Sequence, residues 1–456
     1  MNRLRYPNPF SVLFLGLILL VAMISACTDM PKDHATSLAI VKTSQVQKFI
    51  PDLLPRNASL GSLQEQRKVL STYEMLKNAI NQNPTDYRKR IQLAQLFMLE
   101  ARVTGEHGHY YPAALQVLDG ILQEASKPDV VFGAKSLKAS VKLSLHEFKE
   151  AKKLAEEAVQ LNGYNALIYG SLVDAHVELG EYDKAISMAD KMMSIRPDIR
   201  SYSRVSYLRE LHGDIEGAID AMEMAVKAGY PGYEETSWAA LNLGNLYQKD
   251  GRIPEAKAIY EGILENREDY PFAMAALAEL DRLEGNYHQA EKRLLAAIDI
   301  IPEVSFFEQL TSLLQEMNRM KEADKMKKEV MDMLADDEAN GHKMGMEYAR
   351  FYLEIDGKIG MAREYALKEY AYRPNNIDVN QLLAAIEIKA GEYEVARKYL
   401  RQANITGTIN DELVAMNALM LEYDGKKKEA ERLLKTHAKK HPKQNHIFVD
   451  YIYKNL

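Results

Sequence analysis

The 456-residue sequence contains a single cysteine, Cys27, and a single tryptophan, Trp238. One cysteine excludes any intramolecular disulfide, so an oxidising compartment would add nothing to the stability of the chain. Strong basic character is also missing, since the formal net charge is −7, and this argues against binding to a nucleic-acid phosphate backbone. Beyond the first 26 residues, no apolar stretch is long enough to span a bilayer.

Motifs that carry catalysis or metal binding are absent as well. The sequence has no glycine-rich phosphate loop, no nucleophile elbow and no paired-cysteine metal spacing. The histidines that gather form two groups, Glu106–His107–His109 and His437–His441–His446. Neither group has the glutamate of an HExxH motif, and metal sites need three or four converging ligands. We therefore interpret both groups as solvated surface histidines and expect no catalytic residue, no metal site and no cofactor.

One spacing recurs through most of the chain. A residue that suits a tight turn, usually glycine, is followed five residues later by alanine, and the pair returns about every 34 residues. A fixed period of this length predicts a stacked repeat architecture, which presents a surface and is seldom a reaction vessel. The pairs are Gly108/Ala113, His146/Ala151, Gly180/Ala185, Gly213/Ala218, Gly251/Ala256, Gly285/Ala290, Asn318/Ala323, Gly357/Ala362, Gly391/Ala396 and Gly425/Ala430.

Each repeat is predicted to form two helices, as residues 166–197 illustrate. Apolar residues recur there at steps of three and four, which places them on one helical face. Gly180 permits a left-handed turn, and Pro197 ends the second helix. The alanine has a physical reason, because two antiparallel helices joined by a short turn approach most closely beside that turn.

The turn glycine, the alanine, an aromatic or apolar residue two places after the turn, and a terminal proline together resemble the tetratricopeptide repeat family. The resemblance covers residues 94–442. It implies an all-α fold, a right-handed superhelical solenoid of about ten helix-turn-helix pairs with capping helices. We expect residues 61–93 to form an N-terminal capping helix and a degenerate half-repeat, and residues 443–456 to form a C-terminal capping helix.

Every third connection between repeats is longer by about four residues. The longer connections contain residues 124–130, 228–236 and 335–343. They are three regularly placed functional loops, or they reflect either coincidence or an old triplication without present use. The second connection carries Tyr230 and Tyr233, which we expect to be exposed.

The first residues resemble a bacterial lipoprotein signal. Arg3 and Arg5 precede a short apolar run, and Cys27 follows a stretch that resembles a lipobox. The resemblance implies a signal peptide at 1–26, lipidation of Cys27 and a tether at 27–60. It also implies a periplasm-facing lipoprotein of the bacterial cell envelope, attached to the membrane through the lipid. Thr28, rather than aspartate, follows Cys27 and favours the outer over the inner membrane.

In the tetratricopeptide family the first helix of each pair lines the concave groove. Counting back from the turn positions places one set of chemically suitable residues there: Arg200, Arg204, Tyr207, Trp238, Asn242, Asn245, Glu279 and Arg282. Asparagine can bond both groups of a peptide backbone, arginine can hold a carboxylate, and tryptophan offers a rigid apolar platform. Farther along, the same count places Glu308, Glu316, Glu347, Glu354 and Phe351 in an acidic part of the groove.

These features favour a non-enzymatic function. The first hypothesis is an envelope-anchored scaffold lipoprotein that mediates protein–protein interactions, in assembly of a secretion, surface-structure or polysaccharide-export system. The alternative is a periplasmic, chaperone-like module that holds peptides or clients in the groove. Both imply a protein or peptide partner in the cell envelope and no nucleic acid.

Overall fold

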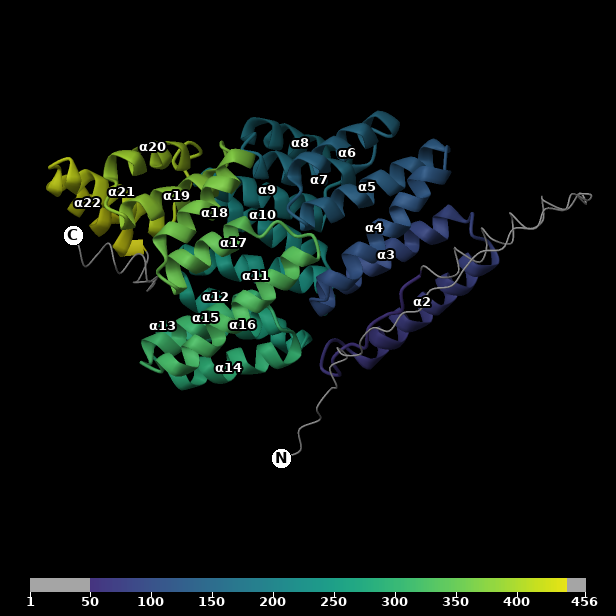
Figure 1. The fold of residues 1–456 in the computed structure, drawn as a ribbon, viewed down its shortest axis with the longest axis horizontal. Coiled ribbons are helices and arrows are strands. Elements are labelled where there is room, and N and C mark those ends of the chain that lie inside the picture. The colour runs from purple at the N-terminus through teal and green to yellow at the C-terminus, as the bar shows by residue number, and fades with distance from the viewer. Residues whose placement is uncertain (1–49, 441–456) are drawn as a thin grey trace, which may run out of the picture. The chain divides into compact units, whose positions relative to one another are not determined.

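The computed structural model describes residues 50–440, and throughout this range every regular element is a helix (Figure 1). The predicted signal peptide, Cys27, residues 28–49 of the predicted tether and the predicted closing helix at 443–456 lie outside the described residues. Within 50–440, we find no helix with the length and apolar character that crossing a membrane requires.

A single helix, α2 (Leu63–Gln82), is followed by ten antiparallel helix pairs, which confirms the predicted solenoid. The pairs are α3 (Tyr87–Thr104) with α4 (His107–Glu124), α5 (Pro128–Ser144) with α6 (Phe148–Leu161), α7 (Ala166–Glu178) with α8 (Tyr182–Ile195), α9 (Ile199–Leu211) with α10 (Ile215–Ala228), α11 (Glu234–Lys249) with α12 (Ile253–Asn266), α13 (Pro271–Leu283) with α14 (Tyr287–Ile300), α15 (Val304–Glu316) with α16 (Met320–Ala339), α17 (Gly345–Arg350) and η1 (Phe351–Ile355) with α18 (Ile359–Tyr372), α19 (Ile377–Lys389) with α20 (Tyr393–Ala403), and α21 (Asp411–Tyr423) with α22 (Lys427–Lys440).

The turn and alanine positions behave as the spacing predicts. All ten alanines are at most 4 % exposed, so each allows the close approach of its two helices. The turn slot is left-handed even where it is not glycine, with φ of 58° at His146 and 59° at Asn318. The first pair departs from the prediction: the left-handed residue is Gly105, with φ of 74°, and Gly108 lies inside α4.

The described end of the predicted tether lies against the helices. Leu60 is buried, and Ile50, Leu53 and Leu54 pack on the apolar cluster of α2 to α5. Arg56 donates two hydrogen bonds to the buried carboxylate of Glu100 in α3. Residues 50–60 therefore form part of the cap, and the first complete pair begins with α3, before the expected start at residue 94.

Two of the three longer connections are loops, at residues 125–127 and 229–233. In the third, α16 continues to Ala339, and only residues 340–344 join it to α17. The following segment η1 is a single wide turn in which the amide of Asp356 bonds the carbonyl of Phe351, five residues back. Tyr230 and Tyr233 are 76 % and 66 % exposed, as predicted.

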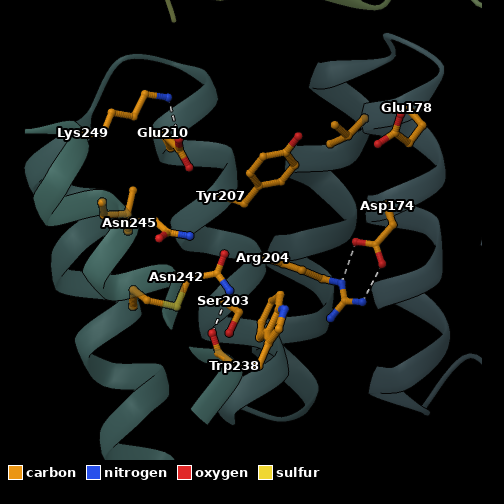
Figure 2. Close-up of a pocket in the computed structure, with 13 residues that line it drawn as sticks. Asp174, Glu178, Ser203, Arg204, Tyr207, Glu210, Trp238, Asn242, Asn245 and Lys249 are labelled. Atoms are coloured by element: carbon orange, nitrogen blue, oxygen red, sulfur yellow. Dashed lines mark hydrogen bonds and ion pairs between the residues drawn. The ribbon is translucent and has the colours of Figure 1, made fainter. Parts of the chain in front are cut away.

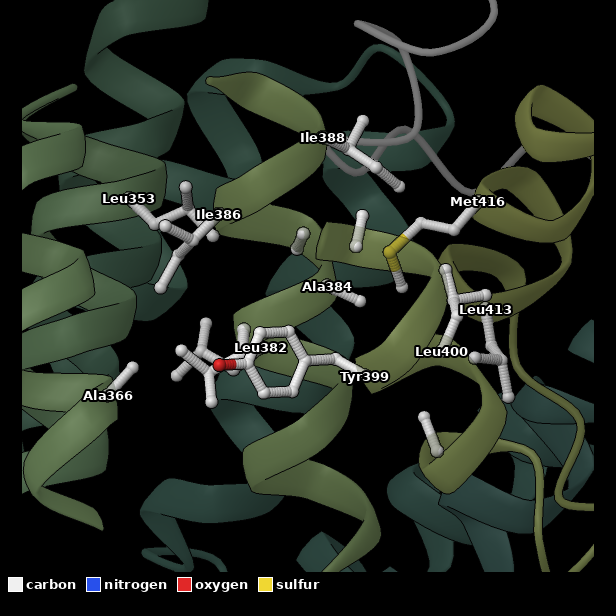
Figure 3. Close-up of a cluster of buried hydrophobic side chains, with 14 of the residues drawn as sticks. Leu353, Ala366, Leu382, Ala384, Ile386, Ile388, Tyr399, Leu400, Leu413 and Met416 are labelled. Atoms are coloured by element: carbon white, nitrogen blue, oxygen red, sulfur yellow. The ribbon is translucent and has the colours of Figure 1, made fainter. Parts of the chain in front are cut away.

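The apolar core around α19 shows how later pairs are buried (Figure 3). Leu382 and Ile386 are fully buried between α18, α20 and α21, and so is Val379. Ile377, at the start of the same helix, packs instead with Tyr182 and Val177 of the third pair. Since α19 has partners on several sides, it is apolar nearly all round and carries little helical amphipathicity.

The contact of Ile377 belongs to a wider junction between early and late pairs, which we call the seam. The Tyr182 hydroxyl accepts a hydrogen bond from the Ile377 amide at 2.8 Å, across 195 residues of sequence. Asn376 Nδ2 donates to the Glu178 carbonyl at 3.1 Å, across 198 residues, and the Lys343 amide donates to the Leu145 carbonyl at 3.2 Å. The solenoid thus returns upon itself after roughly six pairs, given a 34-residue period for this family.

Candidate binding groove

A cavity of about 540 Å³ lies where α7, α9 and α11 face each other (Figure 2). Its lining includes five of the eight groove residues expected from sequence, namely Arg204, Tyr207, Trp238, Asn242 and Asn245. Counting back from the turn residue therefore identified side chains of α9 and α11 that line this cavity. The lining also contains Asp174, Val177, Glu178, Ser203, Glu210, Met222, Leu246 and Lys249.

Trp238 and the two asparagines stand on α11, spaced so that they share one face. Trp238 is 46 % exposed and stands beside Arg204 in Figure 2. Asn242 Nδ2 donates to the Trp238 carbonyl at 2.8 Å, and Asn245 Oδ1 accepts from the Tyr260 hydroxyl at 2.7 Å. Each side-chain amide thus uses one of its two polar groups in a hydrogen bond within the groove wall. The other group can form a hydrogen bond with a bound chain.

The Arg204 guanidinium is held flat against α7. Its Nε and Nη2 atoms donate to the two carboxylate oxygens of Asp174, at 2.9 Å and 2.6 Å. Nε also reaches the Gly170 carbonyl at 3.1 Å, and a Cβ at Gly170 would lie only 3.0 Å from the guanidinium carbon. Burial alone would lower the pKa of Arg204, but the charge of Asp174 outweighs it and the pKa is raised. Arg204 is therefore a wall residue whose charge already has a partner, rather than a free clamp for a carboxylate.

The other three predicted groove residues do not line this cavity. Arg200 pairs with Glu235 at the start of α11. Arg282 bonds Glu279 on its own helix and Glu316 on α15, at 2.7 Å and 2.5 Å. Arg200 and Arg282 thus form ion pairs between neighbouring first helices and hold successive pairs in register, whereas Glu279 pairs within α13.

Late pairs close one side of the groove. Arg373 pairs with Glu178 of the cavity and lies over the ring of Phe148, 4.9 Å from its centre. Enclosure raises the pKa of the Tyr207 hydroxyl well above its usual value, and the carboxylates of Asp378 and Glu178 add to the shift. A second, polar cavity of about 370 Å³ continues from Asp174 and Glu178 into the seam. The sequence count identifies Asp174 when it is applied to the preceding pair, but no sequence signal places Arg373 here.

The predicted acidic stretch is only partly in the groove. Phe351 is 2 % exposed and belongs to the core, so its predicted groove position is wrong. The wide turn of η1 inserts one residue and rotates the helix face. Burial raises the pKa of Glu308 to about 7, with the charge of Glu354 adding to the effect. Glu316 is neutralised by Arg282, so this region holds less free negative charge than its composition indicates.

The interpretation of the histidines as solvated is wrong for two of them. His437 bonds Asp411 of α21, and its side chain is 10 % exposed. The His107 ring lies beside the His342 ring, and burial lowers the pKa of His107 to about 4. His109 bonds the Asp52 carbonyl at 3.0 Å, whereas His441 and His446 fall outside the described residues.

Fold and groove together define the class of this chain, an α-solenoid built from tetratricopeptide-type helix pairs. Residues 142–210 match the family model described as tetratricopeptide repeat. This segment runs from α5 to α9 and contributes Asp174, Arg204 and Tyr207 to the cavity.

Two curated proteins are similar in sequence. Cellulose synthase operon protein C of Pseudomonas fluorescens (strain SBW25) is 23 % identical over 252 residues, which is 51 % of this chain and 19 % of that protein. Small glutamine-rich tetratricopeptide repeat-containing protein 2 of Saccharomyces cerevisiae is 28 % identical over 114 residues, 22 % of this chain and 33 % of that protein. The matches thus cover a third or less of the length of either relative.

Solved structures with a similar arrangement include a thermophilic tetratricopeptide protein of Thermus thermophilus, at 22 % identity and a TM-score of 0.35. That match covers 45 % of this chain and 98 % of the other. Another is pilF of Pseudomonas aeruginosa, at 16 % identity and a TM-score of 0.37, covering 45 % of this chain and 93 % of the other.

Proposed function

We propose that the protein is an envelope-anchored scaffold lipoprotein that recruits a protein partner by holding an extended segment of it in the groove of α7, α9 and α11. The observation that carries the proposal is the 540 Å³ cavity with the exposed Trp238 in its lining. An exposed indole in a concave polar setting is the kind of anchor on which protein recognition depends.

The wall chemistry supports a peptide main chain as the bound group. Asn242 and Asn245 present amides on one helix face, while Arg204 and Lys249 are paired with Asp174 and Glu210. Because these charges are balanced, the groove does not demand a charged terminus, and we propose an internal segment as the ligand.

The envelope setting rests on Cys27 and the sequence before it. We propose lipidation at Cys27, a periplasm-facing position and the outer membrane as the site of attachment. The likeness to a protein of a cellulose synthase operon supports a role in assembling a polysaccharide-export system. Replacing Cys27 by serine should abolish labelling of the protein by a radioactive fatty acid in cells, and a serine variant that is still labelled would contradict lipidation at Cys27.

The partner is tested with the intact protein as bait in solubilised envelopes. Trp238→Ala combined with Asn242→Ala should reduce recovery of the specific partner at least tenfold, because both side chains face the cavity while neither is needed for the core. Tyr164→Ala serves as the matched control, since Tyr164 is 87 % exposed on the α6–α7 turn, away from the cavity lining. Equal recovery with both variants would overturn the groove assignment.

The alternative, a client-holding module, uses the same cavity and predicts a different selectivity. A scaffold should recover one partner, whereas a client holder should bind many unrelated extended peptides with similar affinity. Binding of a peptide library to the wild type and to the Trp238→Ala variant distinguishes the two.

A further inference from the structure

Three side chains from two distant parts of the sequence converge where the start of α4 meets the end of α16. They are His107, Asp337 and His342, and one ligand atom from each lies within 4.8 Å of the others. The imidazole rings of His107 and His342 have their centres 5.7 Å apart. His342 Nδ1 lies 4.0 Å from the Asp337 carboxylate.

The backbone around this cluster is fixed by the seam. The Lys343 amide donates to the Leu145 carbonyl, and His146 Nδ1 donates to the Lys343 carbonyl at 2.9 Å. Gly108 is tightly covered, since a Cβ there would lie 2.5 Å from the Asn340 side chain. The three side chains are thus presented by two rigid helix ends and a short bonded loop, rather than by a free surface.

Polar groups in the cluster lack the partners that burial demands. The His342 side chain is 6 % exposed, and its Nδ1 has no hydrogen-bond partner among the described residues. The same holds for the buried Oε2 of Glu347 close by. A buried nitrogen or oxygen without a partner destabilises the folded chain, so such atoms mark a place where something further binds.

We propose that His107, Asp337 and His342 bind a divalent transition-metal ion of the zinc class, which joins the first pair of the solenoid to the seventh across the seam. Two imidazoles and one carboxylate are ligands that Zn²⁺ prefers, and a water molecule would complete a four-coordinate site. Tetrahedral ligands at about 2.0 Å from zinc stand roughly 3.3 Å apart, so rotamer adjustments of about an ångström are enough to close the site.

The electrostatic surroundings suit a cation. The negative charges of Asp336 and Glu347 act on Asp337, and Asp337 acts on Glu303. A bound cation would balance the negative charge that gathers there.

The ion would act as a structural staple. His107 belongs to α4, Asp337 lies near the end of α16 and His342 lies in the connection that follows α16, so a bound metal would resist separation of these pairs. The inference stands apart from the proposed function, since no residue of the metal cluster lines the groove cavity.

The test uses the full-length chain without a polyhistidine tag, stripped with a chelator and titrated with Zn²⁺ by calorimetry. We expect one ion per chain, a higher midpoint of thermal unfolding, and slower hydrogen exchange at the Lys343 amide. His107→Ala and Asp337→Asn should each weaken zinc binding by roughly 100-fold or more, because removal of a direct ligand costs at least as much as loss of an outer-shell group. Both variants must keep the helical circular dichroism of the wild type.

His288→Ala is the matched control, since His288 is exposed on α14 and far in sequence from the cluster. Zinc bound through Cys27 would persist in His107→Ala and would leave exchange at Lys343 unchanged. No bound zinc, or binding that is equal in His107→Ala, Asp337→Asn and His288→Ala, would overturn the proposal.

Discussion

The groove and the seam are both lined with charged side chains, but they balance these charges differently. In the groove, Arg204 meets Asp174 and Lys249 meets Glu210, each within the wall. At the proposed metal site in the seam, His342 Nδ1 and Glu347 Oε2 are buried without hydrogen-bond partners in the described part of the chain. A surface whose charges are already paired suits a neutral peptide backbone. Buried polar atoms that lack hydrogen-bond partners favour the binding of an ion.

The contrast also separates local from long-range stability. Groove contacts join neighbouring pairs, as expected for a one-dimensional repeat array. Seam contacts join residues 195 or more apart, and they include hydrogen bonds from the Ile377 amide to the Tyr182 hydroxyl and from the Asn376 side chain to the Glu178 carbonyl. We therefore expect changes in the seam to affect unfolding more strongly than comparable changes in the groove.

The largest loss of folding stability is expected from a side chain added where the two sides of the seam meet at Gly180. Gly180 has φ of 73°, and a Cβ there would run into the backbone of Asn375 on the facing turn. Gly180→Ala should cost about 3 kcal/mol or more, because the clash with fixed backbone adds to the left-handed penalty of roughly 1–2 kcal/mol. Denaturant unfolding monitored by circular dichroism measures the loss.

The chain offers a matched control for this prediction. Gly285 occupies the same turn position with φ of 82°, and nothing lies within 4 Å of the Cβ it would gain. Gly285→Ala should therefore cost only the left-handed penalty of about 1–2 kcal/mol. Equal losses at the two positions would show that the seam adds nothing to stability.

An intermediate effect on stability is expected from Glu308, because burial raises the pKa of its carboxyl group to about 7. Since the folded-state pKa exceeds the unfolded value, its contribution to stability is present at low pH and is lost as pH rises through about 7. Between about pH 5.5 and 8.5 this group should remove about 2 kcal/mol, and Glu308→Gln should abolish that share. Glu354, Glu347 and Arg350 are the charged groups that act on it. Unfolding midpoints at both pH values test this, and Glu265→Gln, an exposed site on α12, should leave the pH dependence unchanged.

The smallest effect is expected from the groove wall. Arg204 and Asp174 have side chains 26 % and 36 % exposed, so solvent screens much of their attraction. A double-mutant cycle with Arg204→Met and Asp174→Asn should give a coupling energy of about 1 kcal/mol. The more exposed pair Arg200–Glu235, at 44 % and 43 %, should couple less, and the reverse order would contradict this account of the wall.

Much of the fold follows from the sequence because the repeat is a local pattern. The ten alanines, the left-handed turns at His146 and Asn318 and the ends of most helices depend on residues only a few positions apart. The same register located five groove residues. It failed at Gly108, since GEHGHYY offers two glycines three apart and only Gly105 precedes the helix start. It failed at Phe351 because the wide helical turn of η1 lies between Phe351 and the turn residue, so a count back from that residue gives the wrong helix face.

The seam could not be predicted, because it depends on small rotations accumulated over about six pairs. No local pattern indicates that His107 meets His342, or that Arg373 reaches Glu178. The paired state of Arg204 was missed for a related reason. A residue count gives the face of a helix on which a side chain lies, but the partner comes from the neighbouring helix.

The return of the solenoid upon itself limits how the gene for such a protein can change in length. Loss or gain of one helix pair between Tyr182 and Ile377 would move every partner across the seam by about 34 residues, so that no present contact would survive. Pairs added after α22 would leave these partners in place. Repeat number should therefore vary at the carboxyl-terminal end of this array and stay fixed within it, even though each unit is nearly interchangeable with the next.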